Sequence, residues 1–245
     1  MARRGEAERD GPAMSLDALR ARIRALEGGG GGFARRCARL GGPLDEALPW
    51  RGLPAGALHE LRGPAAGALA AAFARRFLEH RGALVWIQDE RDAACRGELY
   101  GPGLAAFGIT PERLLMARCR DGREVLWSFE EALRCPGVAC AVAEADRLDL
   151  LASRRLQLAA ESGGGAGLLV GGDVESLSPC AALTRWRAAP LPAAGGGLVL
   201  RLELRRIKGG APATWTVSWD ERTLAFAVAA GLADRAGAAE RRATG

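Results

Sequence analysis

The stretch from Arg51 to Glu90 holds the residues whose order is most typical of a phosphate-binding site. An apolar strand is expected over Ala57 to Leu61, and Gly63 and Pro64 form a turn after it. An alanine-rich helix and a second apolar strand come next. In many βαβ units this order places a turn and a helix N-terminus where phosphates bind.

The turn nevertheless lacks the side chains of a working P-loop. That loop reads G-x-x-x-x-G-K-[ST], because backbone N–H groups hold the phosphates, lysine reaches the outer phosphate oxygens and the hydroxyl binds Mg²⁺. Counted from Gly63, positions 68, 69 and 70 hold alanine, leucine and alanine, and Gly67 comes one position early. The only lysine, Lys208, lies far along the chain. We therefore predict that the turn (Gly63, Pro64, Gly67) keeps its geometry but binds no nucleotide cofactor and no metal.

The elements around this turn predict an α/β fold. Further strands are expected over 83–87, 114–117, 138–142 and 168–170, and helices alternate with them. Asp121 and Asp149 are expected to cap two of these helices. Strands alternating with helices at this spacing favour a mostly parallel sheet with helices on both faces.

The pattern changes after Gly171. Leucines at 198, 200, 202 and 204 alternate with polar residues, and Trp215, Val217 and Trp219 do the same after a turn at Gly209. This period of two predicts antiparallel, half-buried strands that extend the sheet.

Length and composition suit one large domain with appendages. We predict an N-terminal helix, from the cap Ser15 to about Glu27, and a flexible glycine-rich linker within 1–47, a core over 48–230 and a tail over 231–245. Six cysteines without C-x-x-C pairs argue against a zinc site or a disulfide framework. The chain shows no signal peptide and no apolar run of about 20 residues, so we expect no membrane span and a cytoplasmic location.

Positive charge is concentrated in one region. The net charge is +5 and the pI about 9.2. A basic chain suits a nucleic-acid or acidic partner, but arginine in place of lysine, with many alanines and glycines, is also what a GC-rich genome would produce. The candidate contacts are Arg185, Trp186, Arg187, Arg205 and Arg206. These residues could grip a nucleic-acid backbone or an acidic protein, or they could form the solvated face of a hairpin, with the tryptophan in the core.

Six blocks of the chain resemble one family. They are LPWRGLPAGALHELRGPAAG at 48–67, LYGPGLAAFGITPERLL at 99–115, LWSFEEALRC at 126–135, LDLLASRRLQLAAESGG at 148–164, SPCAALTRWRAAP at 178–190 and TWTVSWD at 214–220. The chain is similar to the ImuA family, the RecA-like accessory proteins of bacterial damage-induced mutagenesis. The resemblance implies a RecA-like core with a degenerate P-loop.

The resemblance also gives meaning to two carboxylates. Glu90 matches the position of the glutamate that activates water in RecA-type enzymes, and Glu144 is the nearest acid to the end of the strand that would hold a metal. Without the P-loop lysine and hydroxyl, both are interpreted as vestigial, and Glu90 as a loop residue or helix cap. An active nucleotide phosphohydrolase that uses both carboxylates is the enzyme alternative.

The leading hypothesis is a non-catalytic adaptor in a damage-inducible translesion-synthesis complex, the mutasome. The resemblance implies contacts with an ImuB-type inactive Y-family polymerase-like protein, an error-prone replicative-type DNA polymerase and RecA, with weak or indirect DNA binding. The alternative is a SulA-like cell-division inhibitor that binds FtsZ, because SulA-type proteins share the core without a P-loop.

Overall fold

The computed structural model describes residues 36–79, 82–146, 148–173, 179–193 and 197–228. All of them belong to one compact unit. The predicted N-terminal helix, the glycine run at 28–32 and the tail at 231–245 lie outside the described residues.

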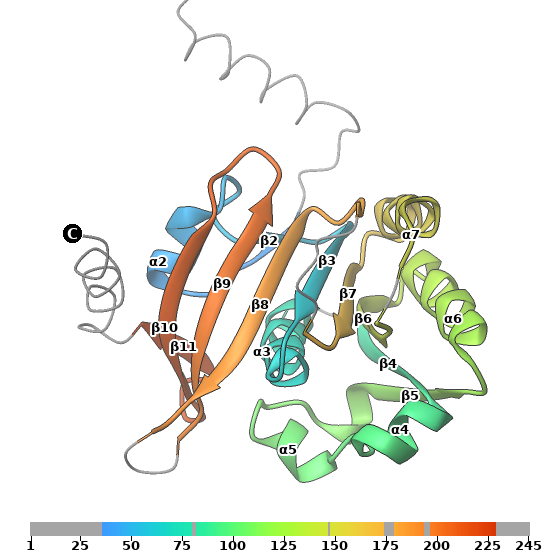
Figure 1. Cartoon of the computed structure of the whole chain (residues 1–245), viewed down its shortest axis with the longest axis horizontal. Coiled ribbons are helices and arrows are strands. Elements are labelled where there is room, and N and C mark those ends of the chain that lie inside the picture. The colour runs from blue at the N-terminus through green and yellow to red at the C-terminus, as the bar shows by residue number, and fades with distance from the viewer. Residues whose placement is uncertain (1–35, 80–81, 147, 174–178, 194–196, 229–245) are drawn as a thin grey trace, which may run out of the picture. The chain divides into compact units, whose positions relative to one another are not determined.

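A nine-stranded sheet runs through this unit, in the order β11-β10-β9-β8-β3-β7-β6-β4-β5 (Figure 1). The six strands from β8 to β5 are parallel, and β9, β10 and β11 continue antiparallel from β8. The strands are β3 Ala57–Arg62, β4 Ala83–Asp89, β5 Leu114–Cys119, β6 Val138–Glu144, β7 Ala166–Gly171, β8 Thr184–Leu191, β9 Val199–Ile207, β10 Ala213–Asp220 and β11 Ala225–Val228. The predicted mostly parallel α/β sheet with antiparallel C-terminal strands is confirmed.

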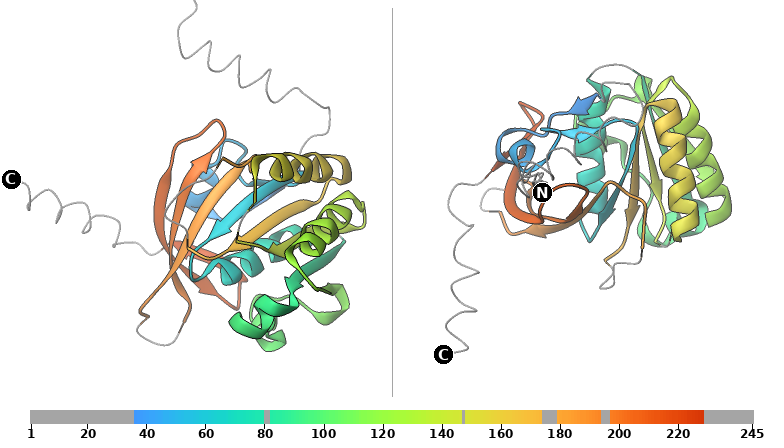
Figure 2. Two further views of the ribbon diagram at one scale, coloured as in Figure 1. Left: turned by 45° about the vertical axis from the view of Figure 1, so that its right-hand side comes forward. Right: turned by 90° about the horizontal axis from the view of Figure 1, so that it is seen from above.

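Helices cover both faces of the sheet. Figure 2 shows α3 (Ala66–Leu78) on one face and the pair α6 (Gly122–Arg134) and α7 (Leu150–Gly163) on the other. The shorter helices α4 (Glu90–Arg96) and α5 (Gly101–Ala105) and a 3-10 turn, Pro111–Arg113, connect β4 to β5. Strands β1 (Cys37–Ala38) and β2 (Leu53–Pro54) form a separate two-stranded antiparallel sheet. Helix α2 (Gly42–Ala47) lies between them in the sequence.

Each face has its own apolar core. On the α3 face, Phe73 and Trp186 pack with the inward leucines of β9. On the other face, Phe129 of α6 packs with Leu156 of α7. Leu200, which lies in the alternating run, is fully buried, so the predicted period of two is confirmed.

The starts of α6 and α7 follow from their capping residues, as predicted. Asp121 Oδ1 accepts the backbone N–H of Glu124 at 2.9 Å, and Asp149 Oδ1 accepts that of Ala152 at 2.6 Å. A carboxylate at this position satisfies a backbone donor that the helix itself cannot bond.

Several boundaries differ from the sequence prediction. A proline after Gly63 also suits the first position of the following helix, but α3 begins at Ala66, so Pro64 lies in the turn. Strands β4, β5 and β6 each run two residues further than predicted, and β7 begins two residues earlier. Glu144 is therefore the last residue of β6, and Glu90 is the first residue of α4.

Strand β5 forms one end of the sheet among the described residues, where it pairs with β4 alone. Leu115 and Met116 are exposed on this strand. Within the described part of the chain, no helix is both long enough and apolar enough to span a membrane.

Candidate functional site

The turn after β3 is closed by strand β8. Gly63 adopts a φ of +100°, and a Cβ placed on it would lie 2.5 Å from the carbonyl oxygen of Ala188 in β8. The N–H of Ala65 donates to that same oxygen at 3.1 Å, and the N–H of Ala66 donates to the Gly63 carbonyl at 3.0 Å. Two backbone donors that could otherwise face a phosphate are thus bonded within the protein.

Gly67 plays a different part from Gly63. It is the exposed second residue of α3, and a Cβ there would meet no atom within 4 Å. Neither space nor a left-handed backbone requires glycine at this position.

A buried ion cluster crosses from β3 to β8. Glu60 accepts the Nε–H of Arg62 at 2.9 Å, and its other carboxylate oxygen accepts the Nε–H of Arg185. Arg62 also donates from Nη1 to the carbonyl of Ala145 at 3.1 Å, and it passes over Gly171, where a Cβ would collide with it. All three charged side chains are almost completely buried. Glu60 is therefore the shared counter-ion of two arginines, and the cluster ties β3 to β8 and to the end of β6.

The position of Arg185 corrects its assignment as a surface contact. Only 4% of the residue is exposed, because the β8–β3 pairing places it opposite Glu60. Trp186 is 1% exposed and packs edge-on against Phe73 at 5.4 Å between ring centroids. The core interpretation of Trp186 is confirmed, and neither residue is available to a partner or to DNA.

The remaining basic candidates pair with groups of the protein itself. Arg187 bonds Asp173, with Nε 2.9 Å from Oδ1, and this contact raises the pKa of the arginine and lowers that of the aspartate. Arg205 lies 3.3 Å from Glu203, and Arg206 donates to the carbonyl of Cys180 at 3.3 Å. Of these three arginines, Arg206 is exposed and the other two are half-buried.

A chain of hydrogen bonds lies beneath this region. The indole N–H of Trp186 donates to Thr184 Oγ1 at 2.8 Å, and that hydroxyl lies 2.8 Å from His59 Nδ1. The Nε2 of His59 lies 3.0 Å from the carbonyl of Pro54, which can only accept, so Nε2 carries the proton. Complete burial lowers the pKa of His59 to about 4.

The two predicted carboxylates do not form a common site. Glu144 Oε1 accepts the indole N–H of Trp86 at 2.7 Å and the side-chain amide of Gln88 at 2.9 Å. Glu90 is exposed in the first turn of α4, whose cap is Asp89, because Asp89 accepts the N–H of Arg91 at 2.8 Å. The residue that caps α4 is thus Asp89, and Glu90 is the first residue of the helix. No group of three or more His, Cys, Asp or Glu within the described ranges is arranged to hold a metal ion.

A groove of about 890 Å³ opens where β4, β5 and β6 end. Strand β4 leads through α4 into α5, whose Leu104 packs in the α3 core, whereas β6 leads into α7 on the opposite face. Neighbouring strands of an α/β sheet that continue to opposite faces leave a crevice at their carboxyl ends, which is the usual place for a ligand. Glu144 lines this groove.

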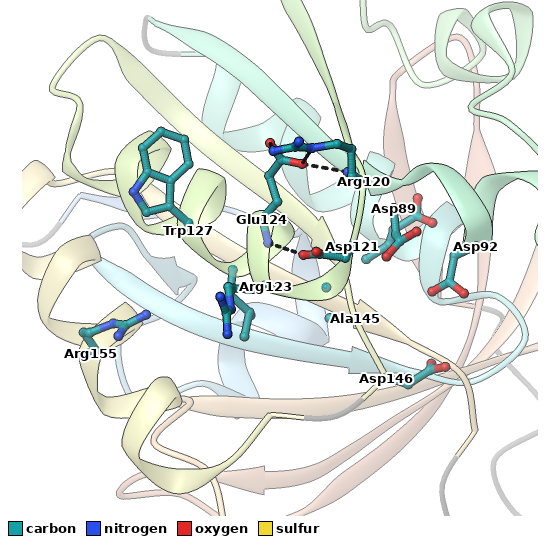
Figure 3. Close-up of a pocket in the computed structure, with 13 residues that line it drawn as sticks. Asp89, Asp92, Arg120, Asp121, Arg123, Glu124, Trp127, Ala145, Asp146 and Arg155 are labelled. Atoms are coloured by element: carbon teal, nitrogen blue, oxygen red, sulfur yellow. Dashed lines mark hydrogen bonds and ion pairs between the residues drawn. The ribbon is translucent and has the colours of Figure 1, made fainter.

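The groove has two chemically different halves. Figure 3 shows Trp127, Arg123 and Arg155 on one side and Asp92 and Asp146 on the other. Several charged groups of the lining already have partners within the protein: Arg120 forms an i,i+4 ion pair with Glu124, Arg155 pairs with Glu130, and Asp146 accepts the N–H of Gly172. The pair with Arg120 lowers the pKa of Glu124.

Sequence reasoning did not single out this groove. Trp127 lies in the helix that Asp121 caps, but outside the i, i+4, i+8 spacing of Val125, Phe129 and Leu133, and this was the available signal. A large aromatic residue on the polar side of an amphipathic helix indicates a surface that binds a ligand or another protein.

Comparison with known proteins identifies the family. The chain is similar to Protein ImuA of Caulobacter vibrioides, in strain NA1000 / CB15N and in strain ATCC 19089 / CIP 103742 / CB 15. Each match is 37% identical over 203 residues and covers 73% of this chain and 81% of the relative. No model of a known protein family matches the chain. An identity of this level over most of both chains shows that the protein belongs to the ImuA family.

Proposed function

We propose that the chain is a non-catalytic, RecA-like adaptor of a damage-inducible translesion-synthesis complex. Membership of the ImuA family supports the biological setting. The turn between β3 and α3 supports this interpretation, because a P-loop also lies between a strand and the helix that follows it. The proposal treats this turn as a degenerate P-loop.

The observation that carries the proposal is the closure of this turn by β8. Ala188 accepts the N–H of Ala65 and occupies the space beside Gly63. No lysine or hydroxyl side chain follows in the first turn of α3. Phosphoryl transfer depends on such groups to place the phosphates and the metal, so a chain without them acts through its surfaces.

The proposed partners are an ImuB-type inactive Y-family polymerase-like protein, an error-prone replicative-type polymerase and RecA. Burial of Arg185 and Trp186 and the internal pairing of Arg187 leave little free positive charge around β8. This supports weak or indirect DNA binding and favours protein contacts.

The test is recovery of partners from cells treated with a DNA-damaging agent. The tagged chain is expected to recover a polymerase-like protein, and deletion of its gene is expected to reduce induced mutagenesis. Recovery of FtsZ, with unchanged mutagenesis in the deletion strain, would instead indicate a division inhibitor. ATP turnover that is lost in Glu144→Gln would indicate an enzyme.

A further inference from the structure

Large apolar side chains are exposed on the outer side of the helix pair α6 and α7. Trp127 is 61% exposed, Leu151 78% and Leu158 64%. The opposite sides of the same helices are buried through Phe129 and Leu156. Helix α7 is therefore apolar on two sides and α6 exposes one large aromatic side chain, whereas a helix that only covers a sheet is expected to be apolar on one side.

The exposed groups form one continuous surface with the groove. Leu151 and Leu158 are seven residues apart and so lie on the same side of α7, and Arg155 lies between them on that side. Arg155 and Trp127 also line the groove. We call Trp127, Leu151, Arg155 and Leu158 the helix-pair surface.

The charge of the groove is opposite to that of the protein. Its lining contains six carboxylates and three guanidinium groups, on a chain whose net charge is +5. Arg155 pairs with Glu130 outside the lining at 2.6 Å, and Arg120 pairs with Glu124 within it at 3.1 Å, so beyond these two pairs the lining holds five carboxylates and one arginine, Arg123. A local excess of negative charge next to an apolar surface favours a partner that is apolar along one side and basic at one end.

We propose that the helix-pair surface and the groove bind an amphipathic helix of a protein partner with basic residues at one end. Its apolar side chains pack on Trp127, Leu151 and Leu158, and its lysines or arginines reach Asp92 on the far side of the groove. A cation can also stack on the exposed indole of Trp127. Nucleic acid fits this surface less well, since its phosphates would face the carboxylates. The inference rests on the proposed function only in that an adaptor needs a surface of this kind.

The first experiment measures binding of labelled peptides to the full chain by fluorescence anisotropy. The probe is a helical peptide of about 18 residues, or five turns, with leucines on one side and lysines at one end. The comparison probe carries glutamates in place of the lysines, and a single-stranded oligonucleotide is the third. We expect the basic peptide to bind with a Kd in the micromolar range and the acidic peptide to bind at least about tenfold more weakly.

Matched variants locate the site. Trp127→Ala and Leu151→Ser are each expected to weaken binding of the basic peptide by about tenfold or more, and Asp92→Lys by a similar factor. Leu115→Ser is the control, because Leu115 is 60% exposed but lies on β5 outside the helix-pair surface. All four substituted side chains are at least partly exposed, so the urea midpoints of the variants are expected to match the wild type.

Three results would overturn the proposal. These are equal affinity for the acidic peptide, an equal loss of affinity in Leu115→Ser, and oligonucleotide binding that depends on Trp127 while peptide binding does not.

The partner recovery from damaged cells separates this inference from the proposed function. If the wild type recovers a polymerase-like protein and the Trp127→Ala, Leu151→Ser double variant recovers it equally well, the surface is wrong and the adaptor role stands. If the wild type recovers no such partner, the adaptor role fails, whereas the peptide measurements still decide the surface.

Discussion

A side chain on Gly63 would lie 2.5 Å from the carbonyl oxygen of Ala188, so these two residues fix the approach of β8 to the turn after β3. Ala188 also accepts the N–H of Ala65. The sheet itself therefore holds the turn. Glycine is needed at position 63 because the backbone there is left-handed and β8 leaves no room for a Cβ.

The two glycines of the turn region are expected to respond oppositely to alanine. Gly63→Ala should destabilise the protein by about 1–3 kcal/mol, because it strains the backbone and collides with Ala188. Gly67→Ala should be neutral or stabilising by up to about 1 kcal/mol, since alanine favours a helix and the site is open. Urea unfolding of both variants and the wild type measures the difference. Equal destabilisation by both would contradict the geometry.

ATP with Mg²⁺ is expected to leave the melting temperature unchanged. A ligand present at a thousand times its Kd stabilises the folded state by roughly 4 kcal/mol, so a micromolar site would be evident at about 1 mM ATP. The N–H of Ala65 is already donated, and no lysine follows it. A saturable upward shift in Tm, reduced by Gly67→Ala, would mean that the turn binds phosphate.

Removing Glu60 is expected to be severe. Glu60→Gln leaves Arg62 and Arg185 buried without their shared counter-ion, and breaking such a group costs about 3–5 kcal/mol. Glu124→Gln is the matched control, because it breaks an ion pair with the exposed Arg120. We expect its unfolding midpoint to be nearly unchanged. Similar midpoints for the two variants would show that the cluster around Glu60 contributes little.

Stability is expected to fall as the pH drops below the ordinary pKa of histidine. Burial lowers the pKa of His59 from 6.5 to about 4, so the unfolded chain binds a proton that the folded protein rejects. The contribution is complete above about pH 6.5 and decreases toward pH 4 by about 1.4 kcal/mol per pH unit. Urea unfolding between pH 7 and 5 measures this slope. His59→Gln should be less stable at pH 7 but should show a smaller slope, and an unchanged slope would assign it to other groups.

Local patterns in the sequence were sufficient to predict much of the fold. Asp121 and Asp149 mark the starts of α6 and α7, and the alternating leucines predict β9, because caps and periods depend only on near neighbours. The parallel pairing of β8 with β3 was not predicted, because it joins segments that are distant in the chain.

The candidate residues were harder to predict for the same reason. Arg185 reads as a solvated arginine until Glu60 is placed opposite it across 125 positions of sequence. A charge reversal at Arg185 is accordingly expected to unfold the protein, because this side chain is buried. The same change at Arg187 is expected to cost less stability, because Arg187 is only half-buried beside Asp173. The groove likewise exists only where three strands end together, although Trp127 gave a local signal.

The place of β3 in the sheet has a consequence for synthesis on the ribosome. Both of its neighbours, β7 and β8, are translated more than 100 residues after it. Until they emerge, the fully buried strand β3 has no partner for its backbone, and the apolar side of α3 has only part of its core. Such long-range closure slows folding and exposes apolar surface to aggregation. We therefore expect the nascent chain to depend on chaperones until about residue 190 has left the exit tunnel.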